Sequence, residues 1–178
     1  MSYKIYNAKK IKLIILLMVC IFTLSGCGEE KYYIPQKVLD VLGFDATEYS
    51  NEIKGALMYE GTYDSVYSEN GDLIFVANEE QIDELLNIGN EGFAYYESVL
   101  KQYGILLECN DTYTEIVVKC KKEQLGESIT EKDVKVFVAE AAWNQALTGV
   151  KPEDLYVYGV VKDIETNEII YEYELYGR

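Results

Sequence analysis

The side chains that could do chemistry in this 178-residue sequence are carboxylates, tyrosines and cysteines, because histidine is absent. Its absence excludes Ser-His and Cys-His catalysis, HExxH zinc sites and imidazole proton shuttles. The 31 acidic residues could supply a glycosidase-like carboxylate pair, about 5–10 Å apart, but no spacing in the sequence selects one. We therefore expect a protein that is not an enzyme and needs no metal or cofactor. The alternative is a small carboxylate-dependent hydrolase of the cell envelope.

Cys27 is the cysteine whose surroundings indicate a chemical modification. Four lysines lie within the first 12 residues, and an uncharged run from Leu13 to Gly28 follows them. The run is shorter than the roughly 20 residues of a membrane-spanning helix, and it has the pattern of a signal peptide. It contains Leu24-Ser25-Gly26-Cys27, which resembles the lipobox of bacterial lipoproteins.

The lipobox resemblance implies a processing step and a location. Residues 1–26 would be removed, and Cys27 would carry a diacylglyceryl thioether with fatty acyl chains such as palmitate. The mature protein would then be anchored by lipid on the extracytoplasmic side of the cell membrane. The alternative is a plain secretory signal with an incidental cysteine, but the sequence lacks an A-x-A-like cleavage site.

Charge limits the partners of the mature chain. The net charge of −15 becomes −19 once residues 1–26 are removed, because that segment holds four lysines and no acidic residue. Such a chain repels nucleic acid and anionic lipid headgroups, so membrane attachment must come from the acyl chains. We expect its partner to be a membrane-proximal protein with a basic surface. The sequence does not indicate the oligomeric state.

The mature chain divides into a short tether at residues 27–33 and one domain at residues 34–178. In the first part of the domain we expect a helix at residues 34–43, an irregular segment at 44–52 and a strand at 53–59. A hairpin follows, with strands at residues 63–69 and 72–77. Its turn is Asn70-Gly71, because both residues tolerate the positive φ of a type I′ turn.

A long helix and a second hairpin follow. Asn78 and Gln81 form a capping box, and apolar residues at helical spacing continue to Tyr103. Gly89 and Gly92 either allow a close approach to the sheet or split this helix. The hairpin pairs residues 105–109 with 114–120, with Leu107 opposite Ile116. In that register Cys109 and Cys120 are too far apart for a disulfide, so we expect free thiols, with a bridge as the alternative.

The pattern repeats with a helix from Glu131, capped by Thr130, and a last hairpin. Its alternating residues place Val161 opposite Tyr171, Gly159 opposite Tyr173 and Val157 opposite Leu175. We therefore expect an α+β fold, an antiparallel sheet built of hairpins with two main helices packed on one face.

Residues 130–176 resemble a PepSY-type module. The likeness consists of an alanine-dotted helix, the Gly149 turn and a hairpin that ends Ile170-Tyr171-Glu172-Tyr173-Glu174. The resemblance implies a peptidase-regulating role, but it covers under a third of the chain. The loop before Tyr171 also lacks the Asp-Gly that such modules often have.

The polar side of the last hairpin is a candidate binding face. The residues concerned are Tyr156, Tyr158, Glu172, Glu174 and Tyr176. Tyrosine brings apolar area and a hydroxyl, so this surface could hold a basic peptide or stack on sugar rings. Two structural alternatives remain open. Tyrosine suits any half-exposed pleated surface, and a further helix could cover this one.

Overall fold

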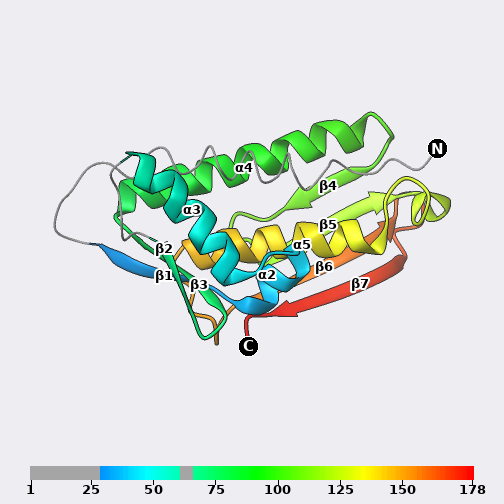
Figure 1. The fold of residues 1–178 in the computed structure, drawn as a ribbon. Helices are drawn as coiled ribbons and strands as arrows, with labels where there is room; N and C mark the ends of the chain where they lie inside the picture. Colours follow the sequence, from blue (N-terminus) through cyan, green and yellow to red (C-terminus); the bar gives the residue numbers. More distant parts are fainter. Residues whose placement is uncertain (1–28, 61–65) are drawn as a thin grey trace.

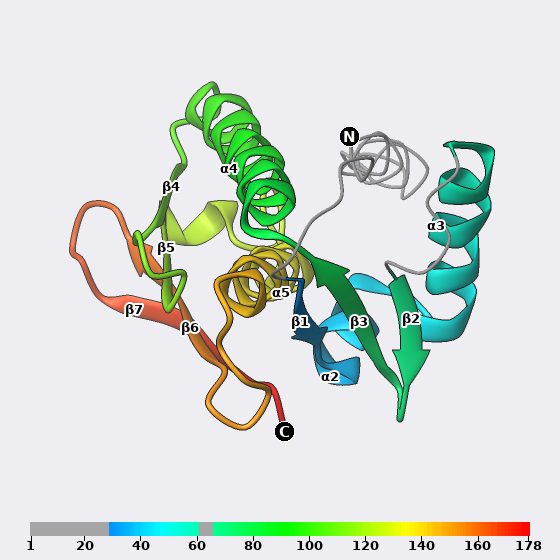
Figure 2. The ribbon, with the colours of Figure 1, turned by 90° about the vertical axis from the view of Figure 1, so that its left-hand side faces the viewer.

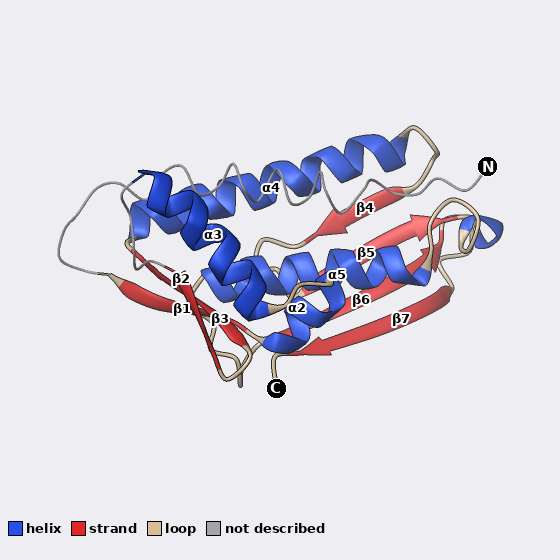
Figure 3. Ribbon diagram, in the orientation of Figure 1, coloured by secondary structure: helices blue, strands red, loops and turns tan. Residues whose placement is uncertain are grey.

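The chain forms two β-sheets on either side of one buried helix. The computed structural model describes residues 29–60 and 66–178. Helix α5 (Glu131–Leu147) runs between the sheets (Figure 1), and the view along it in Figure 2 has one sheet on each side. The fold is α+β, as the sequence predicts (Figure 3).

The first sheet has three antiparallel strands in the order β1-β3-β2. They are β1 (Glu30–Ile34), β2 (Val66–Glu69) and β3 (Asp72–Ala77). The predicted hairpin turn is confirmed, since Glu69 pairs with Asp72 while Asn70 and Gly71 have φ of 54° and 89°. Residues 63–65 of the expected first strand lie outside the described residues.

Strand β1 corrects the expected tether. Residues 30–33 are part of the fold, because β1 pairs with β3 and places Tyr32 opposite Phe75. Ile34 at its end is fully buried opposite Leu73. Residues 28 and 29 alone therefore stand between Cys27 and the first strand in the sequence.

Two helices follow β1. Helix α2 (Gln36–Leu42) begins after Pro35 and ends at Gly43, whose φ is 78°. Helix α3 (Ala46–Glu60) contradicts the irregular segment and the strand that we expected at residues 44–59. It begins where the Asp45 carboxylate accepts a hydrogen bond from the Glu48 N–H at 2.8 Å. Ala46, Tyr49 and Ile53, at helical spacing, are buried.

The second sheet has four strands in the order β4-β5-β6-β7. They are β4 (Leu106–Cys109), β5 (Glu115–Cys120), β6 (Tyr156–Asp163) and β7 (Ile169–Tyr176). The β5–β6 pair is parallel, with the short 3₁₀ helix η2 (Lys122–Gln124) and then α5 in the connection. The expectation of a wholly antiparallel sheet joined by hairpins is therefore wrong at this pair.

In this sheet, one hairpin has the register that the sequence predicts and the other does not. The last hairpin has the predicted pairs Val161–Tyr171, Gly159–Tyr173 and Val157–Leu175. The β4–β5 register is wrong by two residues, since Leu107 lies opposite Val118. A shift of two preserves the faces, so the apolar residues still point to the core. Cys109 and Cys120 are free thiols, as expected.

Helices α4 (Glu79–Lys101) and α5 cover the inner face of the second sheet (Figure 2). Helix α4 begins with the predicted capping box at Asn78, and α5 begins at the predicted N-cap Thr130, which also forms a capping box, with Asp133. Helix α4 continues unbroken through Gly89 and Gly92. Because α5 packs against β1 as well as β5, β6 and β7, it is buried on nearly every side.

Aromatic rings join the two halves of the core around Trp143 of α5. Phe75 of β3 and Tyr49 of α3 meet Trp143 with ring centroids 5.9 Å and 6.1 Å apart. Phe44 stacks on Tyr49 at 4.8 Å. Each such pair adds about 0.5–1.5 kcal/mol beyond burial of its area. Buried residues of both sheets belong to one hydrophobic cluster with α5.

Candidate functional site

The five residues predicted as a binding face lie together on the outer face of the second sheet. We call this set the tyrosine–glutamate face, and its members are Tyr156 and Tyr158 of β6 with Glu172, Glu174 and Tyr176 of β7. Strands place alternate side chains on opposite faces, and all five residues are even-numbered positions of one register. The α5 side holds the odd-numbered Val157, Val161 and Leu175, which are buried.

The hydroxyls of the three tyrosines are hydrogen-bonded to the two glutamates. Tyr156 donates to Glu174 Oε1 at 3.2 Å and Tyr176 donates to Glu174 Oε2 at 2.7 Å. Tyr158 donates to Glu172 Oε1 across the strand pair. The tyrosines thus hold both carboxylates in place on the sheet surface. A partner would meet the ring faces, the remaining carboxylate lone pairs and the lone pairs of the hydroxyl oxygens.

The carboxylates and partial desolvation in turn raise the pKa values of the three phenols. The hydrogen bond to Glu172 raises the pKa of Tyr158 to about 12. The bond to Glu174 raises the pKa of Tyr176, and partial desolvation followed by the same carboxylate raises that of Tyr156. All three hydroxyls therefore remain hydrogen-bond donors at neutral pH.

The tyrosine–glutamate face is accessible in the part of the chain that the structure describes. No helix among those residues covers it (Figure 2), so the helix that we kept as an alternative is not found there. The Tyr156 and Tyr176 rings lie 5.1 Å apart, and Tyr176 is 49% exposed. Farther along the same face, Lys119 forms an ion pair with Glu108 at 2.9 Å.

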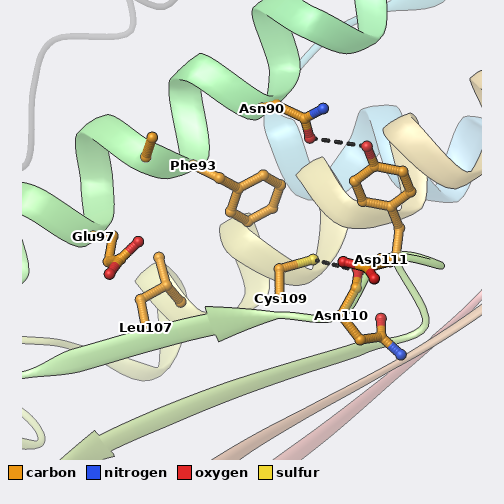
Figure 4. Close-up of a pocket in the computed structure, with 9 residues that line it drawn as sticks. Asn90, Phe93, Glu97, Leu107, Cys109, Asn110 and Asp111 are labelled. Carbon is orange, nitrogen blue, oxygen red and sulfur yellow. Dashed lines mark hydrogen bonds between the residues drawn. The ribbon is translucent and has the colours of Figure 1, made fainter.

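A separate cavity lies between α4 and the turn of the β4–β5 hairpin (Figure 4). Its volume is about 460 Å³, and it is lined by Asn90, Phe93, Ala94, Glu97, Leu107, Cys109, Asn110, Asp111 and Tyr113. The Tyr113 hydroxyl donates to Asn90 Oδ1 at 2.8 Å and so ties the turn to the helix. Sequence reasoning missed this cavity, because only the packing of α4 over the hairpin brings these residues together.

The cavity lacks an activated nucleophile. Burial, with a smaller effect from Asp111, raises the pKa of the Cys109 thiol to about 11. The thiol is therefore neutral at physiological pH and a poor nucleophile. The two cavity carboxylates, Glu97 and Asp111, lie at opposite ends in Figure 4.

The carboxyl group with a strongly raised pKa lies elsewhere. Glu140 of α5 has a pKa raised to about 7 by burial, and the Tyr96 hydroxyl donates to it at 3.4 Å. Glu140 does not line the cavity of Glu97 and Asp111. Among the described residues, the perturbed carboxyl group and the cavity carboxylates are thus separate, whereas a hydrolase needs them to converge.

Other site types find little support within residues 29–60 and 66–178. No group of three or more potential metal-ligating side chains occurs there. No helix in this part of the chain is long and apolar enough to span a membrane. Cys27 and the lipobox lie outside the described residues.

Comparisons with known proteins found no match to this chain. No family model matches the chain, and neither do any curated proteins or solved structures. The PepSY-like segment at residues 130–176 forms α5, β6 and β7, so that resemblance rests on the order of these elements alone.

Proposed function

We propose that this chain is a lipid-anchored binding module on the extracytoplasmic side of the cell membrane, without catalytic activity. The tyrosine–glutamate face binds a basic surface of a membrane-proximal protein. The observation that carries the proposal is the accessible pairing of aromatic rings with two fixed carboxylates on an uncovered sheet face. Tyrosine supplies contact area at low entropic cost, and pre-positioned charges need no reorganisation on binding.

The separation of the carboxylates favours binding over hydrolysis. A carboxylate-dependent hydrolase requires an acid of raised pKa and a second carboxylate in one cavity. Here Glu140 has the raised pKa, and it lies apart from the cavity that Glu97 and Asp111 line.

The position of β1 limits the distance between the domain and the membrane. With Cys27 as the lipidated residue, the three-residue step to Glu30 spans about 10 Å at most. The domain therefore sits against the bilayer, held by acyl chains and repelled by anionic headgroups. A partner within its reach is itself in the membrane or at its surface.

The anchor is tested by metabolic labelling with a fatty acid. Cys27→Ala should abolish the label and leave the precursor uncleaved at this position, because no thiol remains to accept the diacylglyceryl group. Unchanged labelling of the variant would refute the lipoprotein assignment.

The binding face is tested by recovering partners from membranes after crosslinking, at low and at high salt. We expect Glu172→Lys/Glu174→Lys to reduce recovery at least tenfold, and wild-type recovery to fall with salt. The matched control is Glu153→Lys/Asp154→Lys, which makes the same charge change at exposed positions outside the face. Equal loss in both variants, or no dependence on salt, would exclude this face.

A further inference from the structure

Strand β7 is the edge of the second sheet next to the tyrosine–glutamate face. It has eight residues and pairs with β6 on one side, while no described strand pairs with its other side. An open edge of this length carries a row of unpaired backbone N–H and C=O groups. Natural sheets cover such edges, blunt them or use them to bind another strand.

The register identifies the backbone groups that point to the open side. Gly177 donates its N–H to the Leu155 carbonyl at 3.1 Å, and this pair continues the register of Val157 with Leu175. In an antiparallel pair, hydrogen-bonded and non-hydrogen-bonded positions alternate. The odd-numbered residues of β7 therefore bond to β6, and the N–H and C=O groups of Glu172 and Glu174 point outward.

Glu172 and Glu174 thus present both backbone groups and carboxylates to an added strand. Their backbone groups face the open edge, and their side chains lie on the outer face of the sheet. A strand added to this edge would place two of its residues, spaced two apart, directly opposite these glutamates. Side chains at directly opposite positions lie close enough to interact.

Charge decides which strand fits. A second copy of this chain paired through β7 in antiparallel fashion would bring Glu172 and Glu174 beside the same residues of the other copy. Like charges directly opposite are destabilising, and the chain has a net charge of −15 even before processing. The edge therefore discriminates against self-association and favours a basic strand.

We infer that β7 is the docking edge for an extended basic segment of the partner, which adds to the second sheet as a fifth strand. Lysine or arginine residues two apart lie opposite Glu172 and Glu174. The residue between them lies opposite Tyr173, and the next residue beyond the one facing Glu172 lies opposite Tyr171. Both tyrosines are half-buried on the inner side. The inference rests on the proposed function and specifies how the partner is bound.

The first test uses the lipidated protein in detergent micelles and an eight-residue peptide of alternating lysine and valine. Amide hydrogen exchange, measured by NMR, should slow at Glu172 and Glu174 when the peptide saturates its site on the protein. The amides of Tyr171 and Tyr173 already bond to β6 and should change little. Unchanged exchange at Glu172 and Glu174 with the peptide bound would overturn strand addition.

The second test uses the peptide backbone. For antiparallel addition with lysines opposite the glutamates, N-methylation of the lysine residues should weaken binding at least tenfold, since those N–H groups bond to β7. N-methylation of the valine residues should change the affinity less than twofold. The reverse result would mean parallel addition at the same edge. Full binding by both methylated peptides would refute the inference.

Charge reversal distinguishes binding through the tyrosine–glutamate face from strand addition at β7. Glu172→Lys/Glu174→Lys should weaken binding of the unmethylated peptide at least tenfold, and Glu153→Lys/Asp154→Lys should not. The amide spectrum of each variant is recorded as a control for the fold, because four added units of positive charge change the surface of the sheet. If reversal abolishes partner recovery from membranes while the peptide protects no β7 amide, the face stands and strand addition is wrong.

Discussion

Gly89 of α4 lies against the Asn144 side chain of α5, at the point where the two helices meet. A Cβ atom built at position 89 would stand 2.4 Å from Asn144 Oδ1. Asn144 is 3% exposed, so its side chain cannot move into solvent to make room. The glycine therefore allows a close approach, to a neighbouring helix and not to the sheet.

This contact predicts opposite effects for two glycines of one helix. Gly89→Ala should destabilise the fold by about 1–3 kcal/mol, because overpacking outweighs the gain in helix propensity. Gly92→Ala should be stabilising by up to about 1 kcal/mol, since nothing lies within 4 Å of its Cβ position. Urea unfolding of both variants measures the difference. Stabilisation by Gly89→Ala would show that Asn144 is free to move.

Local sequence was sufficient for the last hairpin. Its strands alternate apolar and polar residues, which fixes the face that points to the core, and the short loop Glu165-Thr166-Asn167 selects one register among those that keep this face inward. Its turn is closed by Asp163, whose carboxylate accepts hydrogen bonds from the Glu165 and Thr166 N–H groups at 3.0 Å and 2.8 Å. The tyrosine–glutamate face could therefore be placed from the sequence.

The β4–β5 register could not be derived in the same way, because residues 110–115, and not the expected residues 110–113, lie between the last paired residues. Asn110 Oδ1 accepts hydrogen bonds from the Thr114 and Glu115 N–H groups, at 2.8 Å and 3.1 Å. Tyr113 has a φ of 56°, an uncommon value for a non-glycine residue. These features lengthen the turn and move the pairing by two residues.

The elements that sequence reasoning missed depend on distant partners. Strand β1 pairs with residues 39 to 47 positions away, and the parallel β5–β6 pair forms only across α5. Helix α3 is different, because Asp45 with Glu48 is a local start signal that the sequence carries. The strand expected at residues 53–59 is wrong because the helix that begins after Asp45 continues to Glu60.

A second prediction concerns Asp72, which links the two ends of the fold. Its carboxylate is nearly buried and accepts hydrogen bonds from the Gln36 N–H at 3.0 Å and Arg178 Nη2 at 3.1 Å. Asp72→Ala should cost about 2–3 kcal/mol, because it removes an acceptor from a part-buried N–H. Arg178→Ala should cost about 1 kcal/mol or less, since that side chain is 62% exposed. Equal losses in urea unfolding would assign the stabilisation to the ion pair.

A third prediction concerns the thiols. Cys109 lies opposite Ile116, so Cys120 is four residues along the strand from its partner, about 13 Å away. A disulfide requires Cα atoms within about 7 Å. Both thiols should react with a thiol reagent after denaturation without reductant. In the native protein at pH 7 both should react slowly, because burial raises the pKa of each. Protection that ends only when reductant is added would reveal a disulfide.

The last prediction concerns Glu140 and the pH dependence of stability. Its pKa is about 7 in the folded protein, against an ordinary value of 4.5, because burial penalises the charged form. Between these values the folded protein holds a proton that the unfolded chain has released. Stability from this group is therefore complete below pH 4.5 and falls as the pH rises through 7.

Glu140→Gln should remove this dependence, because the amide stays neutral and can still accept the Tyr96 hydroxyl. The variant should be more stable than wild type at pH 8, by up to about 3 kcal/mol, and nearly equal to it at pH 4. Urea unfolding at pH 4, 6 and 8 measures the difference between the two proteins. Glu97→Gln, on an exposed position of α4, is the matched control and should change stability by less than about 0.5 kcal/mol at each pH. A stability difference for Glu140→Gln that does not grow with pH would mean that Glu140 is already ionised in the fold.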